Sequence, residues 1–130
     1  MVDLKLTDKQ AKIVARACEF YTRIVLGQFR EIILELVNDD NIQSITENRE
    51  EIEELLFKAR NLIYPDLHGI GHSYGVGNFE HADKAYDVYQ VIRKLFGDPR
   101  VNFSYYTLPE ISHYKDEVEE AIDNYKKGNI

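Results

Sequence analysis

The sequence predicts a mainly α-helical domain, with three to four helices and a minor α+β element in the form of a small two-stranded sheet. Apolar residues recur every three or four positions over long segments, which is the period of an amphipathic helix. Two short segments instead alternate apolar and polar residues, which is the period of a strand. The length of 130 residues is close to the usual size of one domain, so we expect residues 1–130 to form a single domain.

The first strand is predicted at residues 2–6, where apolar and charged residues alternate. Thr7 then begins a capping box with Gln10, which is typical of a helix start. The apolar stripe that follows keeps helical spacing through Val37 and passes Gly27 without losing phase, so it is either one long N-terminal helix or two helices hinged at Gly27. A single helix of about 31 residues would be about 46 Å long, longer than a compact domain of this size is wide. A second chain usually covers the ends of such a helix, and we therefore expect a homodimer.

The second helix follows a polar loop at residues 38–46. Either Thr46 or Asn48 can cap it, since both side chains can accept from helical N–H groups. Pro65 ends this helix, because proline removes a backbone donor. Its apolar face consists of Ile52, Leu55, Leu56, Ala59, Leu62 and Ile63.

The third helix is predicted at residues 82–96, and Gly97 can close it as a left-handed C-terminal cap. Residues 101–106 alternate Val, Phe and Tyr with smaller polar residues, which predicts a second strand able to pair with the first. Residues 109–127 have a weaker amphipathic pattern that predicts a further helix.

Composition restricts the function classes. The net charge is −7, which argues against general nucleic-acid binding because that binding depends on Lys and Arg neutralising phosphates. No apolar run approaches the roughly 20 residues that cross a bilayer, and the start of the chain lacks a secretory pattern. The single cysteine, Cys18, lies on the apolar stripe and fits a buried structural thiol in a reducing compartment. We therefore expect a cytoplasmic protein without a membrane partner.

The most informative segment is rich in glycine and precedes the third helix. Four of the seven glycines lie within residues 69–77. Because glycine loses more backbone freedom on folding than any other residue, such a cluster indicates a tight turn or close approach to a ligand. A loop of small residues that enters a helix N-terminus presents N–H groups and the positive end of the helix dipole, which capture phosphate or carboxylate. We predict a ligand site formed by this loop and one face of the helix, with Ser73, Tyr74, Gly75, Asn78, Tyr86, Tyr89, Gln90 and Arg93 as its residues.

In this site, Ser73, Tyr74 and Asn78 would hold phosphates, a tyrosine of the helix would stack on a base, and Arg93 would supply the counter-charge. The segment lacks the strand that precedes a dinucleotide fingerprint and the ending of a Walker A loop. The alternative interpretation is a glycine-rich turn with a tyrosine packed beneath it.

A metal site is a second interpretation of the same region. His68, His72 and His81 could combine with Glu80 and Asp83 as imidazole and carboxylate ligands of zinc or manganese. The spacing of the first two histidines suits a metal only on a helix, and the glycines between them disfavour a helix there. Capping or surface histidines are the alternative.

Acidic residues on two predicted helices give a third interpretation. The pattern resembles the MazG-like signature, in which all-helical nucleotide pyrophosphohydrolases hold magnesium on facing helices. The metal ligands would be Glu51, Glu54, Glu80 and Asp83, with Glu50 beside them. Acidic runs at helix starts also form solvated faces that complement the helix dipole. We therefore assign no catalytic residue and no cofactor, and favour binding over catalysis.

Three segments resemble a widespread family of small uncharacterised proteins encoded by phages and prophages. They are LTDKQAKIVARACEFYTRIVLGQF at 6–29, HSYGVGNFEHADKAYDVYQVIRKLF at 72–96 and VNF at 101–103. The residues that match the central motif of the family are Ser73, Tyr74, Gly75, Asn78, Glu80, Asp83, Tyr86, Asp87, Gln90 and Arg93. His72 and Phe79 stand where the family has glycine and proline. The resemblance implies a viral context rather than a mechanism.

These observations together favour a phage-encoded accessory protein of the host cytoplasm. We expect it to sequester a small anionic, nucleotide-like ligand, such as a host immune signal, without chemistry. The alternatives are an acidic inhibitor that binds a host defence protein, and the magnesium-dependent pyrophosphohydrolase.

Overall fold

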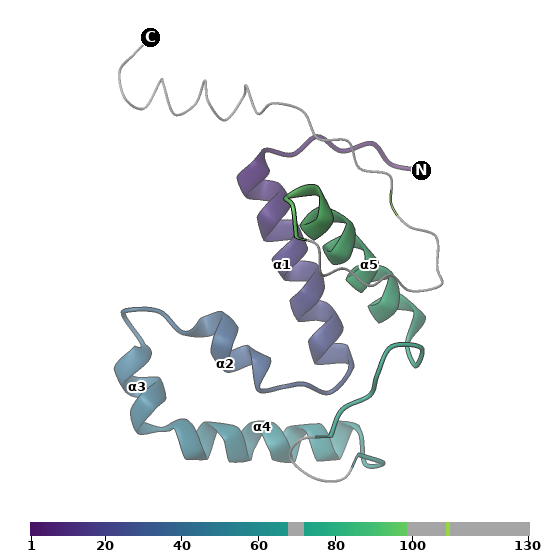
Figure 1. The fold of residues 1–130 in the computed structure, drawn as a ribbon. Helices are drawn as coiled ribbons and strands as arrows, with labels where there is room; N and C mark the ends of the chain where they lie inside the picture. Colours follow the sequence, from purple (N-terminus) through teal and green to yellow (C-terminus); the bar gives the residue numbers. More distant parts are fainter. Residues whose placement is uncertain (68–71, 99–108, 110–130) are drawn as a thin grey trace, which may run out of the picture.

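The computed structural model describes residues 1–67, 72–98 and 109 of the chain. Five helices form within these residues (Figure 1): α1 (Asp8–Val25), α2 (Glu31–Leu36), α3 (Ile42–Glu47), α4 (Arg49–Ile63) and α5 (Glu80–Leu95). α1 and α5 pack side by side and form the main helix–helix contact, while α4 runs along the opposite end of the molecule. Within the described residues, no helix combines the length and apolar character that a membrane crossing requires.

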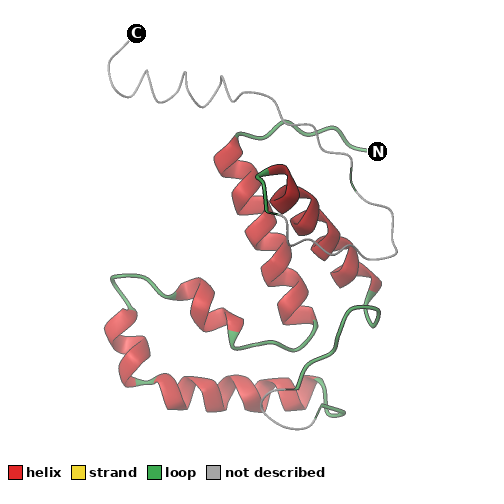
Figure 2. Cartoon of the chain, in the orientation of Figure 1, coloured by secondary structure: helices red, strands yellow, loops and turns green. Residues whose placement is uncertain are grey.

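The predicted two-stranded sheet is wrong. Figure 2 shows only helices and loops in the described part of the chain, and residues 2–6 form no strand. Val2 and Leu4 are 87% and 73% exposed. Alternation alone does not make a strand, because each strand needs the backbone of a neighbour. The partner predicted at residues 101–106 lies outside the described residues.

The start of α1 confirms the predicted capping box. The Thr7 hydroxyl oxygen accepts from the Gln10 N–H at 3.1 Å, and the Gln10 side chain accepts from the Thr7 N–H at 3.0 Å. Two donors that the helix leaves without intrahelical partners are thereby satisfied.

The end of α1 decides between the two predicted forms of the N-terminal helix. The Gly27 N–H donates to the Ile24 carbonyl at 3.0 Å and the Gln28 N–H donates to the Arg23 carbonyl at 2.8 Å. These two bonds form a Schellman motif, in which Gly27 has φ of +91°. The long single helix is therefore wrong and the hinge at Gly27 is confirmed. Because α1 has only 18 residues, the length argument for a homodimer no longer holds.

Close packing also explains the glycine at this hinge. A Cβ atom at Gly27 would lie 2.9 Å from Leu67 Cδ1 and 3.7 Å from Arg60 Cδ. The hinge thus lies against the end of α4 and the loop that follows it. Sequence periodicity gave no sign of the turn, because the apolar stripe continues in phase across it.

The region between α2 and α4 differs from the predicted loop, because α3 occupies most of residues 38–46. α4 begins after Asn48, as predicted, but the Asn48 side chain donates to the Ser44 carbonyl at 2.8 Å and makes no cap bond to α4. Later in the chain, α5 matches the helix predicted at residues 82–96 but begins two residues earlier, at Glu80, and ends one residue earlier, at Leu95. Gly97 closes it with φ of +90°.

The core lies mainly between α1 and α5 and is small. The buried apolar side chains among the described residues are Ala15, Leu26, Ile33, Ala82 and Ile92. The Thr22 hydroxyl is also buried and lies 2.8 Å from the Ala82 carbonyl oxygen, so it joins α1 to α5. By contrast, Leu55 and Leu62 on α4 are 61% and 76% exposed.

Candidate functional site

The glycine-rich loop is fixed to the ends of α1 and α4. The Tyr74 N–H donates to the Leu26 carbonyl at 2.8 Å. The buried Arg60 guanidinium donates to the His72 carbonyl at 2.7 Å. The Tyr74 ring packs edge-on against those of Tyr64 and Phe79, with centroids 5.3 Å apart in each pair. Tyr74 therefore has a packing role here. This role agrees with the alternative interpretation of the segment, a glycine-rich turn with a tyrosine packed beneath it.

A carboxylate in the first turn of α5, that of Asp83, binds the loop that precedes the helix. Asp83 is 1% exposed, and its Oδ2 accepts from the Gly77 N–H at 3.0 Å. A negative charge in the first turn complements the helix dipole, which is the role predicted for a ligand anion. Beside it, the Asn78 amide donates to the Gly75 carbonyl at 2.8 Å, which closes the loop on itself.

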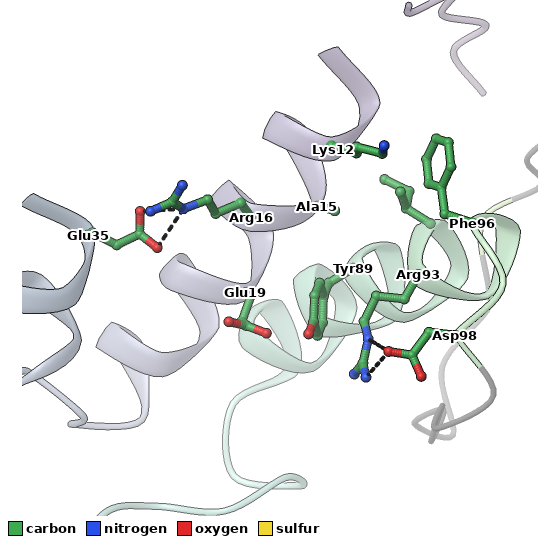
Figure 3. Close-up of a pocket in the computed structure, with 10 residues that line it drawn as sticks. Lys12, Ala15, Arg16, Glu19, Glu35, Tyr89, Arg93, Phe96 and Asp98 are labelled. Atoms are coloured by element: carbon green, nitrogen blue, oxygen red, sulfur yellow. Dashed lines mark hydrogen bonds and ion pairs between the residues drawn. The ribbon is translucent and has the colours of Figure 1, made fainter. Parts of the chain in front are cut away.

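A cleft between α1 and α5 contains a second part of the predicted site (Figure 3). It has a volume of about 420 Å³. It is lined by Lys12, Ala15, Arg16, Glu19, Glu35, Tyr89, Ile92, Arg93, Phe96 and Asp98. Two of the predicted residues, Tyr89 and Arg93, line it directly. The Tyr86 ring lies 5.6 Å from that of Tyr89, and the buried Gln90 side chain accepts from Arg93 at 3.1 Å.

The eight predicted site residues are thus divided between two places. Tyr86, Tyr89, Gln90 and Arg93 lie at or beside the cleft, whereas Ser73, Tyr74, Gly75 and Asn78 lie in the loop before α5. The helix from Glu80 to Arg93 extends about 20 Å at 1.5 Å per residue. Ser73 lines a different cavity, between α2 and α4. The structure does not bring the loop and Arg93 around one ligand position.

Arg93 is held firmly in the cleft. Its guanidinium donates to the Asp98 carboxylate at 2.6 and 3.2 Å and lies 4.9 Å from the centre of the Tyr89 ring. The hydrogen bond that Arg93 donates to the Asp98 carboxylate raises the pKa of Arg93 above its usual value. Figure 3 shows the guanidinium directed at Asp98, so the side chain already has an acidic partner.

Eight of the ten residues that line the cleft were missed by sequence reasoning, among them the cations Lys12 and Arg16. The Lys12 ammonium lies 4.9 Å from the centre of the Phe96 ring, and Arg16 pairs with Glu35 of α2 at 2.9 Å. Lys12 and Arg16 are four residues apart and so share one face of α1. These two cations on one face of α1 were the signal that the sequence offered. Their position opposite Tyr89, however, depends on the packing of α1 on α5.

Tyr89 is a poor acid in this setting. Burial, together with a hydrogen bond to the Glu19 carboxylate, raises the pKa of Tyr89 to about 12. Its phenol therefore stays protonated at neutral pH. Burial likewise raises the pKa of the half-buried Cys18 thiol.

The second cavity, of about 690 Å³, lies between α2 and α4. Glu53 joins its two walls, because its carboxylate accepts from Arg49 at 2.7 Å and from Arg30 at 3.2 Å. The first of these hydrogen bonds contributes most to lowering the pKa of Glu53. Glu50 and Glu54 also line this cavity.

The residues of the two metal interpretations are scattered. Glu51 is exposed on α4, whereas Glu80 pairs with Lys84 at 2.8 Å on α5. The His81 ring packs against those of Tyr21 and Phe79, each at 6.0 Å. Across residues 1–67 and 72–98, no group of three or more His, Cys, Asp or Glu side chains is arranged to hold a metal ion. His68 lies outside the described residues.

Comparisons of this chain with protein-family models, with curated proteins and with solved structures gave no match.

Proposed function

We propose that this protein binds and sequesters a small anionic, nucleotide-like ligand in the cleft between α1 and α5, without chemistry on it. One observation carries the proposal: two cation–ring pairs, Lys12 with Phe96 and Arg93 with Tyr89, line the same cavity. Aromatic faces stack on nucleobases and cations attract phosphates, so the lining fits a ligand with both groups.

The size of the cleft agrees with a ligand of this kind. Its volume of about 420 Å³ lies in the range of roughly 300–1,000 Å³ that is typical of small-molecule sites. Arg16 is open to an incoming phosphate, because its side chain is 65% exposed and its ion pair with Glu35 is at the surface. Exposed ion pairs contribute only about 0–1 kcal/mol, so a phosphate can replace the carboxylate at little cost.

The state of one cleft residue, Tyr89, agrees with sequestration rather than turnover. The raised pKa of Tyr89, about 12, keeps its phenol neutral and therefore weak as a general base. The resemblance to phage proteins supports action in the host cytoplasm, where a nucleotide signal of the host would be the ligand.

The test is isothermal titration of the purified protein with a panel of mononucleotides and cyclic nucleotides. Arg16→Gln should weaken binding about 10- to 100-fold, the usual effect of losing a hydrogen bond to a charged group. Arg30→Gln is the matched control, because Arg30 also pairs with a glutamate, is 60% exposed, and lines the other cavity. Ligand recovered from the complex should be unchanged on chromatography.

Failure of every nucleotide to bind would refute the proposal. Loss of binding in Arg30→Gln alone would place the ligand between α2 and α4, and recovered product would make the protein an enzyme.

A second function is favoured by the outer face of α4. Leu55 and Leu62 are 61% and 76% exposed, and the exposed acidic side chain of Glu51 lies beside them. A face of apolar and acidic groups suits a basic protein partner, as expected of an inhibitor of a host protein. Glu51→Lys would abolish such an interaction and leave nucleotide binding intact.

A further inference from the structure

The charges that line the α1–α5 cleft balance. Lys12, Arg16 and Arg93 supply the positive charges, and Glu19, Glu35 and Asp98 supply the negative charges. A ligand that enters therefore meets a site of no net charge, in a protein whose net charge is −7. Each further negative charge on the ligand adds repulsion that no cation of the lining offsets.

The cations also differ in how readily they exchange partners. Arg93 is 20% exposed and has three partners at once: Asp98, Gln90 and the Tyr89 ring. Arg16 has one carboxylate partner and is 65% exposed. When a phosphate replaces Glu35 at Arg16, the displaced carboxylate remains nearby on α2, because Glu35 itself is held in a helix. A second negative charge on the ligand would then face Glu35 directly.

We infer that the cleft selects a nucleotide with a single negative charge, the phosphodiester of a nucleoside cyclic monophosphate, over phosphomonoesters and triphosphates. This inference rests on the proposed function and specifies its ligand. A phosphomonoester carries about −1.5 to −2 at pH 7, whereas a phosphodiester carries a single negative charge. The lining, whose three cations are balanced by three carboxylates, matches the latter, and the two rings are the surfaces available to its base.

The volume supports one nucleotide unit. About 420 Å³ is near the lower end of the usual range for small-molecule sites. A triphosphate would extend past Arg16 toward Glu35 and out of the cleft, where the rest of the protein repels it.

The experiment compares the affinities of the full-length protein for cyclic AMP, cyclic GMP, AMP and ATP by isothermal titration at pH 7.5. For the base that binds, the cyclic monophosphate should bind at least about 10-fold more tightly than the same base as a monoester or triphosphate. Glu35→Gln should reduce this preference several-fold, because it changes the charge of the cleft from zero to +1 and favours dianions most. Glu53→Gln, which removes the partner of Arg30 at the other cavity, should leave the preference unchanged.

Each outcome decides a separate point. If AMP or ATP binds as tightly as the cyclic form, or if Glu35→Gln leaves the preference unchanged, this inference is wrong while the proposed function stands. If none of the four nucleotides binds, the proposed function fails and the inference fails with it.

Discussion

The Tyr64 hydroxyl donates a 2.7 Å hydrogen bond to the carbonyl oxygen of Val25, the last residue of α1. Tyr64 follows the last residue of α4, so this bond joins the ends of α1 and α4, which are far apart in the sequence. Burial raises the pKa of Tyr64 above its usual value, which keeps the hydroxyl a donor. The same ring packs against Tyr74, so the contact also positions the glycine-rich loop.

Tyr64→Phe should lower the free energy of unfolding by about 1–3 kcal/mol, because it leaves the Val25 carbonyl without this donor. Urea denaturation followed by circular dichroism would measure the loss. Tyr21→Phe is the control, since the Tyr21 side chain is 47% exposed and should tolerate the change. Equal stability of the two variants would show that the bond contributes nothing.

Gly27→Ala should destabilise the protein through two effects. Both Gly27 and Gly97 have φ near +90°, so alanine at either position costs about 1–2 kcal/mol of backbone strain. The new Cβ at Gly27 meets Leu67 Cδ1 at 2.9 Å, whereas among the described residues no atom lies within 4 Å of a Cβ at Gly97. Moving the Leu67 side chain off its rotamer should add about 0.5–1.5 kcal/mol. Matched urea titrations of Gly27→Ala and Gly97→Ala isolate the second effect, and equal losses would contradict the packing.

Asp83→Ala should cost about 1–3 kcal/mol, because the Gly77 N–H loses its acceptor and the first turn of α5 loses a negative charge. Asp83→Asn keeps an acceptor oxygen and should cost less. Glu80→Ala is a second control, in the same turn but with an exposed side chain and a surface ion pair. Thermal unfolding of the three variants should rank Asp83→Ala as the least stable, and any other order would argue against an anchoring role for this carboxylate.

Tyr89 should ionise at higher pH than an ordinary tyrosine. Its pKa in the folded protein, about 12, exceeds the unfolded value of about 10. The corresponding stability is therefore fully present below pH 10 and is lost as the pH rises from 10 through 12. Ultraviolet difference titration of wild type against Tyr89→Phe would identify the late step. In Glu19→Gln the step should move toward pH 10, and an unchanged step would mean that burial alone raises the pKa.

The homodimer expected from the sequence would have to use the exposed face of α4, because α1 is too short to require a second chain, and it would then compete with the basic partner of the second function for Leu55 and Leu62. Burying Leu62 in an interface would contribute about 1.5–3 kcal/mol, and its side chain is 76% exposed in one chain. We expect light scattering after size exclusion to give a dimer, and Leu62→Glu to give a monomer with unchanged helicity. Leu4→Glu, at an exposed position outside the helices, should remain dimeric. A monomeric wild-type protein would contradict the expectation.

Local chemistry determined the helices that the sequence predicted. The Thr7–Gln10 capping box, the glycine cap at Gly97 and the extent of α5 all follow from contacts between residues a few positions apart. Such contacts depend on backbone donors and acceptors that lie close together along the chain, so sequence spacing predicts them. α3 was missed because its short polar segment has the composition of a loop.

Only the tertiary structure decided the direction of the chain after Gly27 and the composition of the cleft. Helical spacing continued across Gly27, so the turn there depended on the packing of this glycine against Leu67 and Arg60, which are distant in sequence. In the same way, spacing placed Arg93 near the loop residues that precede its helix, whereas the packing of α1 on α5 placed it beside Lys12 and Arg16. Periodicity identifies which face of a helix is apolar, but the identity of the helix that covers this face depends on contacts between distant segments. The sequence by itself therefore determined most of the helices and identified two of the ten residues that line the cleft, Tyr89 and Arg93, and the packing of α1 against α5 determined the rest.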